Sequence, residues 1–388
     1  MSNKSLHSDL DIDALIDDRA TRIIVCCGSG GVGKTTTSAA IALRAAERGR
    51  KVVVLTIDPA RRLAQSMGIE QLDNTPRPVP GVGSDGAERG SLDAMMLDMK
   101  RTFDEVVLSQ ASPEKAQQIL ANPFYIALSS SFAGTQEYMA MEKLGQLHRD
   151  AQASGQYDLI VVDTPPSRSA LDFLDAPERL SSFLDGRFIR TMLLPARGPA
   201  RLMSAGIGMV TGALSKVLGG QFLKDLQTFV TALDTVFGGF RQRAQQTYAL
   251  LQASGTAFLV VAAPEDDALR EAAYFVERLQ GDRMPLAGLV VNRAVVSDHA
   301  ELSVAAAVAA AERLETAPSD GAGVTAGLLR IHADRERLVA RQQALRERFA
   351  AAHPQVATIV VPALAGDVHD LDGLRTVGRL LAGPAAEA

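Results

Sequence analysis

The residues best placed to do chemistry lie in the run Cys27-Gly-Ser-Gly-Gly-Val-Gly-Lys-Thr-Thr36. Two glycines, Gly28 and Gly33, bracket four residues, and Lys34 and Thr35 follow, which is the pattern of a phosphate-binding loop. Glycines let backbone N–H groups turn inward around an anion, and a following helix adds its positive end. The predicted nucleotide-binding residues here are Gly28, Ser29, Gly30, Gly31, Val32, Gly33, Lys34, Thr35 and Thr36. Lys34 is expected to reach the outer phosphates, and the Thr35 hydroxyl to bind Mg²⁺.

Two aspartates stand at the ends of apolar runs farther along the chain. Asp58 closes one of them, and a carboxylate beside a phosphate loop is placed to orient an attacking water; a helix cap is the alternative role. Asp163 ends the run LIVVD and is followed by Thr-Pro-Pro. It resembles the Walker B aspartate, which holds Mg²⁺ directly or through water. Asp58 and Lys34 are therefore the predicted catalytic residues, and Thr35 and Asp163 the predicted metal ligands.

Asn292 closes another apolar run, in Val-Val-Asn-Arg293, and its amide suits the hydrogen-bonding edge of a purine. Guanine-specific sites add a lysine and then an aspartate after such an asparagine, whereas Arg293, Ala294 and Val295 follow here. Adenine is therefore favoured over guanine. An ordinary turn asparagine is the other interpretation.

These residues need a sheet that brings strand ends together. Arg22–Cys27 reads as a strand, and Thr36–Glu47 as an amphipathic helix closed by Gly49. Further strands are predicted at Lys51–Asp58, Leu92–Asp98, Tyr157–Asp163, Thr256–Pro264, Leu286–Asn292 and Ala357–Pro362, about seven in all. Apolar runs that alternate with helices indicate an α/β fold with a doubly wound, mostly parallel sheet, whose ligands lie at the carboxyl ends of the strands.

Two kinds of segment interrupt that alternation. Residues 73–91 are rich in proline and glycine and predict a surface loop. Helical stretches at about 99–152 and 172–254 flank the strand that ends at Asp163, and predict an inserted helical subdomain. We therefore expect an N-terminal extension over residues 1–20 and a single domain over residues 21–388.

Composition narrows the class of protein. A chain of 388 residues with 47% hydrophobic and 22% charged residues fits a globular protein. The net charge of −5 offers no electrostatic footprint for nucleic acid. The two cysteines, Cys26 and Cys27, are adjacent on a predicted strand, so they point to opposite faces and are expected to be buried and unpaired. Cysteines of this kind indicate a reducing cytoplasm. We expect no signal peptide in the acidic N-terminus, and no apolar run is long enough to span a bilayer.

The ordered set GSGGVGKTT, TIDPARRLA, DLIVVDTPPS, VVAAPEDDALREAAYFVERL, LVVNR and VPALAGDVHDLDGL resembles the arsenical-pump ATPase family, a group of dimeric P-loop ATPases of the SIMIBI class. That family includes the eukaryotic factor that delivers tail-anchored membrane proteins. The likeness runs from about Arg22 to Leu381. It implies that Asp58 acts on the water in a first switch and that residues 163–167 form a second. It also implies that Asn292, Arg293 and Pro362 contact the adenine end of ATP, and that Pro264-Glu265 is a dimer-contact motif.

Three departures from the family pattern bear on partners. Ser29 stands where the family carries a signature lysine that crosses the dimer interface to the partner's nucleotide. No Cys-x-x-Cys follows Asn292, so the zinc that joins two protomers of the targeting factor is not expected. Cysteines for arsenite are also missing, and soft metalloids need thiolates. A substitute cation could come from Arg61, Arg168 or a paralogous partner that carries the lysine.

The resemblance therefore implies a Mg-dependent, cytoplasmic ATPase that works as a nucleotide-gated dimer. The apolar stretch 203–237 suits a hydrophobic client, although a buried core or dimer contact uses the same residue types. One alternative is a regulatory subunit that binds ATP and hydrolyses little, because Ser29 replaces the lysine. Another is a partition or positioning ATPase, but the C-terminal tail lacks the membrane helix typical of that class.

Overall fold

A computed structural model of the chain describes residues 9–58, 62–83, 90–123, 125–126, 129, 135–165, 239–297, 299, 301–316 and 321–383. It divides into two compact units. The first comprises Met1–Met95, Ser154–Ala170 and Leu251–Ala388, and the second comprises Met96–Ala153 and Leu171–Leu250. Arg61, Arg168, residues 166–167 of the predicted second switch and the stretch 203–237 lie outside the described residues.

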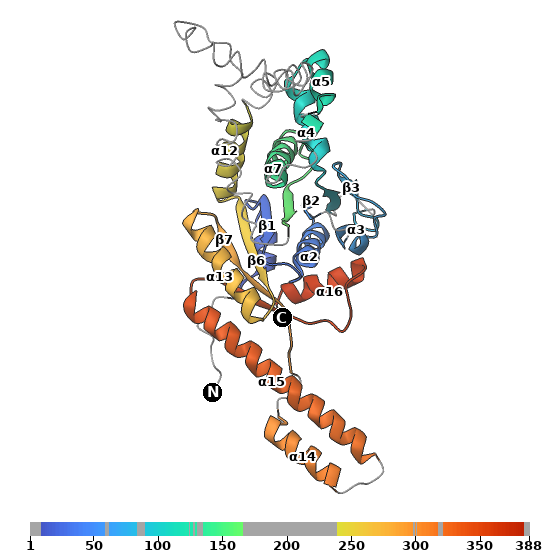
Figure 1. Cartoon of the computed structure of the whole chain (residues 1–388), viewed down its shortest axis with the longest axis vertical. Coiled ribbons are helices and arrows are strands. Elements are labelled where there is room, and N and C mark those ends of the chain that lie inside the picture. Colours follow the sequence, from blue (N-terminus) through green and yellow to red (C-terminus); the bar gives the residue numbers. More distant parts are fainter. Residues whose placement is uncertain are drawn as a thin grey trace, which may run out of the picture. The chain divides into compact units, whose positions relative to one another are not determined.

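The strands of the described residues form one eight-stranded sheet in the order β3-β4-β2-β5-β1-β6-β7-β8 (Figure 1). Their bounds are β1 Ile23–Cys27, β2 Lys51–Thr56, β3 Arg77–Pro78, β4 Ser91–Met96, β5 Leu159–Asp163, β6 Thr256–Ala262, β7 Leu286–Ala294 and β8 Thr358–Pro362. The pairs β2–β5, β5–β1, β1–β6, β6–β7 and β7–β8 are parallel. The predicted α/β class with a mostly parallel sheet is therefore confirmed.

The strand that sequence patterning missed is β3, a two-residue segment inside the proline- and glycine-rich stretch predicted to be a loop. It pairs antiparallel with β4 at the edge of the sheet, and both of its residues are exposed. Pro78 has no N–H to donate, which an edge position tolerates. A two-residue strand without an apolar run leaves no periodic signal in the sequence.

The helices of the first unit connect and flank these strands. They are α1 Ile12–Asp17, α2 Lys34–Glu47, α3 Arg62–Ser66, α13 Asp266–Gly281, α14 Val304–Thr316, α15 Ala322–Ala352 and α16 Leu371–Leu381. From β1 the chain proceeds to β2 on one side of the sheet order, whereas β6 to β7 proceeds in the other direction. Right-handed crossovers then place α2 and α13 on opposite faces. Both faces of the central strands are consequently buried, which fits their largely apolar sequences.

Two further groups of helices belong to this unit, the short helix α1 and the pair α14–α15. The short helix α1 buries Ile12 and Ile16, and its Asp13 pairs with Arg44 of α2. The helix α14 packs along the N-terminal part of the 31-residue helix α15 (Figure 1). Within the described residues, no helix is both long enough and apolar enough to cross a membrane.

The second unit contains helices α4 Met99–Gln110, α5 Pro113–Leu120 and α7 Thr135–Ser154, together with most of α12 Phe240–Gln252. Glu142 of α7 is buried and accepts a hydrogen bond of 2.8 Å from Arg243 of α12. Burial raises the pKa of the Glu142 carboxyl, and the nearby guanidinium opposes that rise. Met139 and Met141 are fully buried, as packing into a helical core requires.

Candidate functional site

The loop after β1 is shaped by glycines at two close approaches. A Cβ on Gly28 would lie 2.1 Å from the carbonyl oxygen of Val261, and one on Gly33 would lie 2.3 Å from the Asn292 amide. Gly33 is also the N-cap of α2 and has a φ of +93°, a left-handed conformation that favours glycine. No side chain of the described chain caps this helix end. The first N–H groups of α2 therefore remain available to an anion.

Lys34 lies folded against this loop. Its ammonium donates a hydrogen bond of 2.7 Å to the carbonyl oxygen of Ser29, and the side chain is buried. Burial lowers the pKa of Lys34, while the nearby Asp163 carboxylate raises it. A buried ammonium held by one carbonyl has donors left for a second, negatively charged acceptor.

Asp163 is the most buried carboxyl group of the site. Its Oδ2 accepts hydrogen bonds from the Thr35 hydroxyl at 2.8 Å and from the Thr56 hydroxyl at 2.9 Å. Its Oδ1 is buried and has no hydrogen-bond partner among the described residues. Burial raises the pKa of Asp163 to about 6, although both hydroxyl donors lower it. A hydroxyl and a carboxylate with one oxygen to spare fit the oxygen-ligand chemistry of Mg²⁺.

Thr56 has a role that the motif search did not find. It is the last residue of β2, and the parallel register of β2 and β5 places it opposite Asp163. The only sequence signal was a hydroxyl at the end of a strand, two residues before Asp58. Strand register decides whether such a hydroxyl meets its neighbour, and register is not visible in a single motif.

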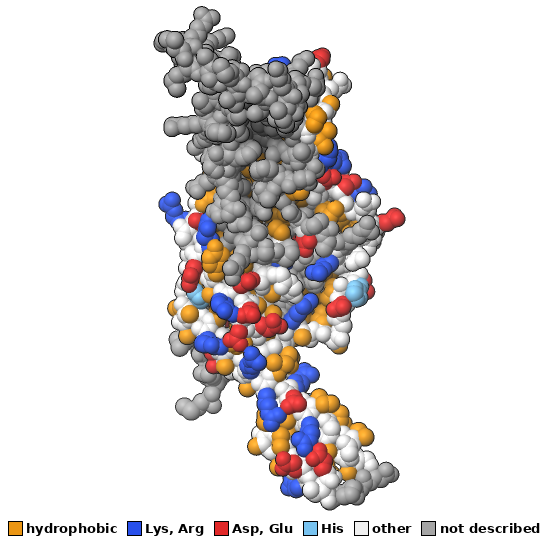
Figure 2. All heavy atoms as spheres, in the orientation of Figure 1, with side chains coloured by type: hydrophobic (Ala, Val, Ile, Leu, Met, Phe, Trp, Pro, Cys, Tyr) orange, Lys and Arg blue, Asp and Glu red, His pale blue; other side chains and the backbone are white. Residues whose placement is uncertain are grey.

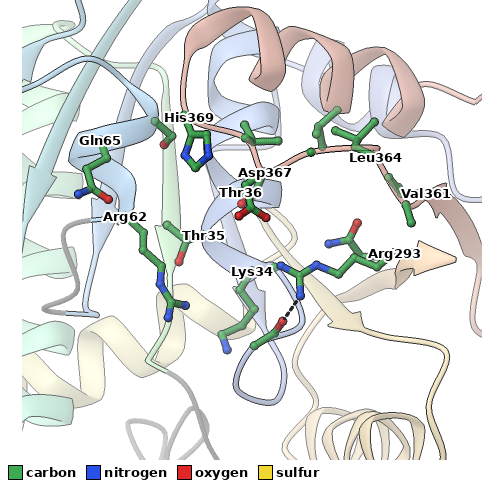
Figure 3. A pocket seen from close by; sticks show the side chains of 18 of the residues that line it. Lys34, Thr35, Thr36, Arg62, Gln65, Arg293, Val361, Leu364, Asp367 and His369 are labelled. Atoms are coloured by element: carbon green, nitrogen blue, oxygen red, sulfur yellow. Dashed lines mark hydrogen bonds between the residues drawn. The ribbon is translucent and has the colours of Figure 1, made fainter.

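Lys34 and Thr35 border a cavity of about 760 Å³ at the carboxyl ends of the strands (Figure 3). Of the sequence-predicted residues, it is lined by Gly31, Gly33, Lys34, Thr35, Thr36, Asp58, Asn292, Arg293 and Pro362. Ser29, Gly30 and Val32 instead line a smaller cavity on the other side of the loop, which Gly31 and Arg293 border as well. Gly28 packs against β6, and Asp163 lies below Thr35. The structure thus gathers the predicted residues around one loop but distributes them over its two sides.

The far end of the large cavity is built by β7, β8 and the loop after β8. Asn292 donates from Nδ2 to the carbonyl oxygen of Val32 at 2.8 Å, which fixes its amide and leaves Oδ1 as an acceptor. Arg293 has a φ of +61°, uncommon for a side-chain-bearing residue, and donates to the carbonyl oxygen of Gly31 at 2.8 Å (Figure 3). These two residues hold the phosphate loop against the end of β7.

Other residues of this cavity were not singled out from the sequence. They are Arg62, Gln65 and Ser66 of α3, Val361 of β8, residues 363–369 after β8, which include Asp367 and His369, and Val377 of α16 (Figure 3). The segment after β8 belongs to the motif VPALAGDVHDLDGL, from which only Pro362 was chosen. Loop residues of this kind carry no periodicity, so only the fold reveals that they face the site.

The two cysteines of β1 take no part in this site. Both are fully buried and free, as predicted from their place on a strand. Burial raises the pKa of both thiols, that of Cys26 to about 12. They are therefore protonated near neutral pH and poor ligands for a soft metal.

A parallel sheet with a glycine-rich loop between β1 and α2, and a Thr35–Asp163 pair beneath that loop, defines a P-loop nucleotide-binding protein. The chain belongs to the anion-transporting ATPase family, whose profile matches residues 21–314. It is accordingly an ATP hydrolase of that family, and the predicted family resemblance is confirmed.

Individual relatives are moderately similar. The chain is 27% identical over 303 residues to an ATPase GET3 of Podospora anserina, covering 76% of this chain and 80% of the relative. It is 27% identical over 297 residues to an ATPase ASNA1 homolog of Cryptosporidium parvum, covering 76% and 72%. An arsenical pump-driving ATPase of Acidiphilium multivorum is 30% identical over 160 residues, which cover 41% of this chain and 26% of that protein.

Proposed function

We propose that the large cavity binds Mg-ATP, with the phosphates on the loop between β1 and α2 and the adenine between Asn292 and Pro362. Lys34 and the backbone N–H groups hold the phosphates, and Thr35 and Asp163 hold Mg²⁺ directly or through water. Mg²⁺, when bound, neutralises charge on the phosphate oxygens. The observation that carries the proposal is the Thr35–Asp163 hydrogen bond, which leaves one buried carboxylate oxygen without a partner among the residues described.

The orientation of Asn292 supports adenine as the base. Its Nδ2 donates to the Val32 carbonyl oxygen, so Oδ1 is the atom left to accept a hydrogen bond from a ligand in the cavity that Asn292 lines. The 6-amino group of adenine donates a hydrogen bond, whereas O6 of guanine only accepts one. The neighbouring Arg293 is held by Gly31 and borders the same end of the cavity. Discrimination against GTP follows from this arrangement.

For hydrolysis we assign Asp58 the positioning of the attacking water. Asp58 lines the cavity together with Lys34 and Thr35, just beyond the end of β2.

We also propose that ATP closes a dimer, made of two copies or of this chain and a paralogue that carries the signature lysine. Closure would rearrange the helical insert, which comprises the segments at about 99–152 and 172–254. That rearrangement would change the affinity of the insert for a hydrophobic client protein in the cytoplasm. The proposed function does not involve nucleic acid, arsenite or zinc.

A second candidate is a regulatory subunit that binds ATP and hydrolyses little on its own. The observation that favours it is Ser29, an uncharged residue at the position of the family's trans-acting lysine. A cation supplied from a neighbour is worth orders of magnitude in rate to phosphoryl transfer. Without it, the chain would hold ATP with the same residues and turn it over slowly.

The experiment that separates the two compares ATP hydrolysis by the wild-type chain and by Asp58→Asn. The switch hypothesis predicts turnover by the wild type and a loss of about 100-fold or more in the variant, because the water loses its positioning carboxylate. ATP binding, measured in parallel, should stay near the wild-type value. Equal, near-background rates with intact binding would instead establish the regulatory subunit, and a retained rate in Asp58→Asn would remove Asp58 from the mechanism.

A further inference from the structure

The large cavity is lined by an arginine to which the proposed ATP site assigns no role. Arg62 is the first residue of α3 and borders this cavity. The same lining includes Lys34, Thr35 and Asp58. Figure 3 shows the Arg62 side chain beside Thr35, on the side away from Arg293, with its guanidinium extending toward the Lys34 ammonium. Arg62 therefore lies at the end of the cavity assigned to the phosphates, and not at the end assigned to adenine.

The packing of α3 determines which of its side chains face the cavity. Leu63 and Ala64 are buried, and the Ser66 hydroxyl donates to the Leu63 carbonyl oxygen at 3.0 Å. The helix contacts α2, which follows the phosphate loop. Arg62 and Gln65 are the exposed residues of α3, and both line the cavity. A packed helix thus presents Arg62 to the phosphate end.

The guanidinium of Arg62 is not neutralised by the residues that the structure describes, with which it makes no hydrogen bond or ion pair. Lys34 and Arg293, which line the same cavity, each donate instead to a carbonyl oxygen of the phosphate loop. An arginine without such a partner has five N–H donors for a ligand. Their planar arrangement matches two oxygens of one phosphoryl group.

The charges at the phosphate end favour a second cation. Lys34 contributes one ammonium to this end, and the carboxyl groups of Asp58 and Asp163 lie near it. Ser29, at the position of the family's trans-acting lysine, is uncharged and lines the smaller cavity on the other side of the loop. Phosphoryl transfer develops negative charge that a positioned guanidinium stabilises. Arg62 can supply that guanidinium from within the chain.

We propose that Arg62 is a catalytic residue, which stabilises the γ-phosphoryl group of ATP while it is transferred to water. In that step the water oxygen bonds to the γ-phosphorus, and the bond from the γ-phosphorus to the β–γ bridging oxygen breaks, with its electron pair left on ADP. One proton of the water stays on the released phosphate, and the other passes to solvent. Arg62 donates two N–H groups to the equatorial oxygens, over which the negative charge is spread. This inference rests on the proposed ATP site and makes turnover independent of a lysine from a partner chain.

The test compares wild type with Arg62→Ala and Arg62→Lys in three measurements: ATP hydrolysis, binding of ATP, and binding of ADP with aluminium fluoride, which mimics the transferring phosphoryl group. Arg62→Ala should lose at least about 100-fold in kcat, because arginines that act on this group are worth orders of magnitude in rate. It should bind ADP with aluminium fluoride at least about tenfold more weakly, whereas its affinity for ATP should change by less than about threefold. Arg62→Lys should recover only part of the loss, since an ammonium lacks the planar fork.

The matched control is Arg77→Ala, which removes an exposed arginine of the same compact unit that lines neither cavity. It should match wild type in all three measurements. Urea unfolding should give the same stability for Arg62→Ala and wild type, because the Arg62 side chain is exposed and has no partner among the described residues to lose.

An Arg62→Ala chain that keeps the wild-type kcat, or that loses affinity equally for ATP and for ADP with aluminium fluoride, would overturn the inference. A wild-type chain that binds ATP but hydrolyses it only at the background rate would also overturn it, because a cation in the same chain would then not suffice. Absent ATP binding in every sample, including wild type, would overturn the proposed ATP site and this inference with it. Intact ATP binding with unchanged kinetics would overturn this inference alone, so the two failures are distinguished.

Discussion

Asp163 shows at the scale of one residue how the site departs from ordinary protein interior. The carboxyl is fully buried, and its pKa is raised to about 6 from an ordinary 3.8. As pH rises, the Asp163 carboxyl loses its proton at a lower pH in the unfolded chain than in the folded one. Between pH 3.8 and about 6 the folded state therefore binds this proton more tightly than the unfolded state does. Stability therefore falls as pH rises from 3.8 to about 6 and stays lower above it. The metal-free site consequently weakens the fold at neutral pH.

Asp163→Asn should accordingly be more stable than wild type at pH 8 in EDTA and without nucleotide, on the order of 2 kcal/mol. The amide oxygen can still accept from Thr35 and Thr56, so only the buried charge is removed. Urea unfolding at pH 8 and pH 5 measures the difference, which should narrow at pH 5 because wild-type Asp163 is then mostly protonated. A variant that is less stable than wild type at pH 8 would contradict this reading of the site.

At the scale of elements, Arg50 joins three parts of the first unit. Its guanidinium is 1% exposed and donates to the carbonyl oxygens of Ile16, Thr21 and Asp158 and to the Asp158 carboxylate. It thereby fixes α1, the entry to β1 and the entry to β5 just before β2 begins. Residues 9–20, which sequence patterning assigned to an extension, include some of the carbonyl groups that Arg50 needs.

Arg50→Met should lower the free energy of unfolding by about 3 kcal/mol or more, since it leaves buried carbonyl groups without a donor. Arg19→Met is the matched control, because Arg19 pairs with the same Asp158 but is 58% exposed. That exposed pair should be worth less than about 1 kcal/mol. Denaturant unfolding of both variants compares the two losses. Equal losses would show that burial of Arg50 is unimportant.

The same scale shows what the sequence could and could not predict. Apolar runs bounded by glycine or aspartate located β1, β2 and β5 within one or two residues, because buried parallel strands leave a strong signal. The sequence signal for the helix pair α14–α15 was weak. The pair packs through alanines such as Ala307, Ala311 and Ala326, while Leu328 and Ile331 on α15 are exposed. Small buried and large exposed residues blur the apolar face on which helix prediction depends.

Within the site, residues that act through their own type were predictable, and residues that act through geometry were not. Lys34 and Asp163 belong to motifs with a recognisable pattern, so the sequence placed them. The role of Thr56 depends on the register of β2 against β5. That of Arg293 depends on a positive φ, which turns its side chain back onto the loop. Neither strand register nor a positive φ can be predicted from a local sequence pattern.

At the scale of the whole molecule, the first of the two compact units holds both cavities. The phosphate loop separates the cavities, with Gly31 and Arg293 on the border of each. A ligand in the large cavity and a ligand in the smaller cavity would thus contact the same short loop. Because that loop is held by Asn292 and Arg293, binding on one side is expected to affect the other.

The central claim is that this loop and the large cavity form one adenine-specific Mg-nucleotide site. Isothermal titration of the purified chain with ATP and GTP in the presence of Mg²⁺, alongside Lys34→Ala, tests it most directly. We predict one ATP bound per chain, GTP at least about tenfold weaker, and Lys34→Ala weaker than wild type by about the same factor or more. A wild-type chain that binds no ATP, or a Lys34→Ala chain that binds it equally well, would contradict the account.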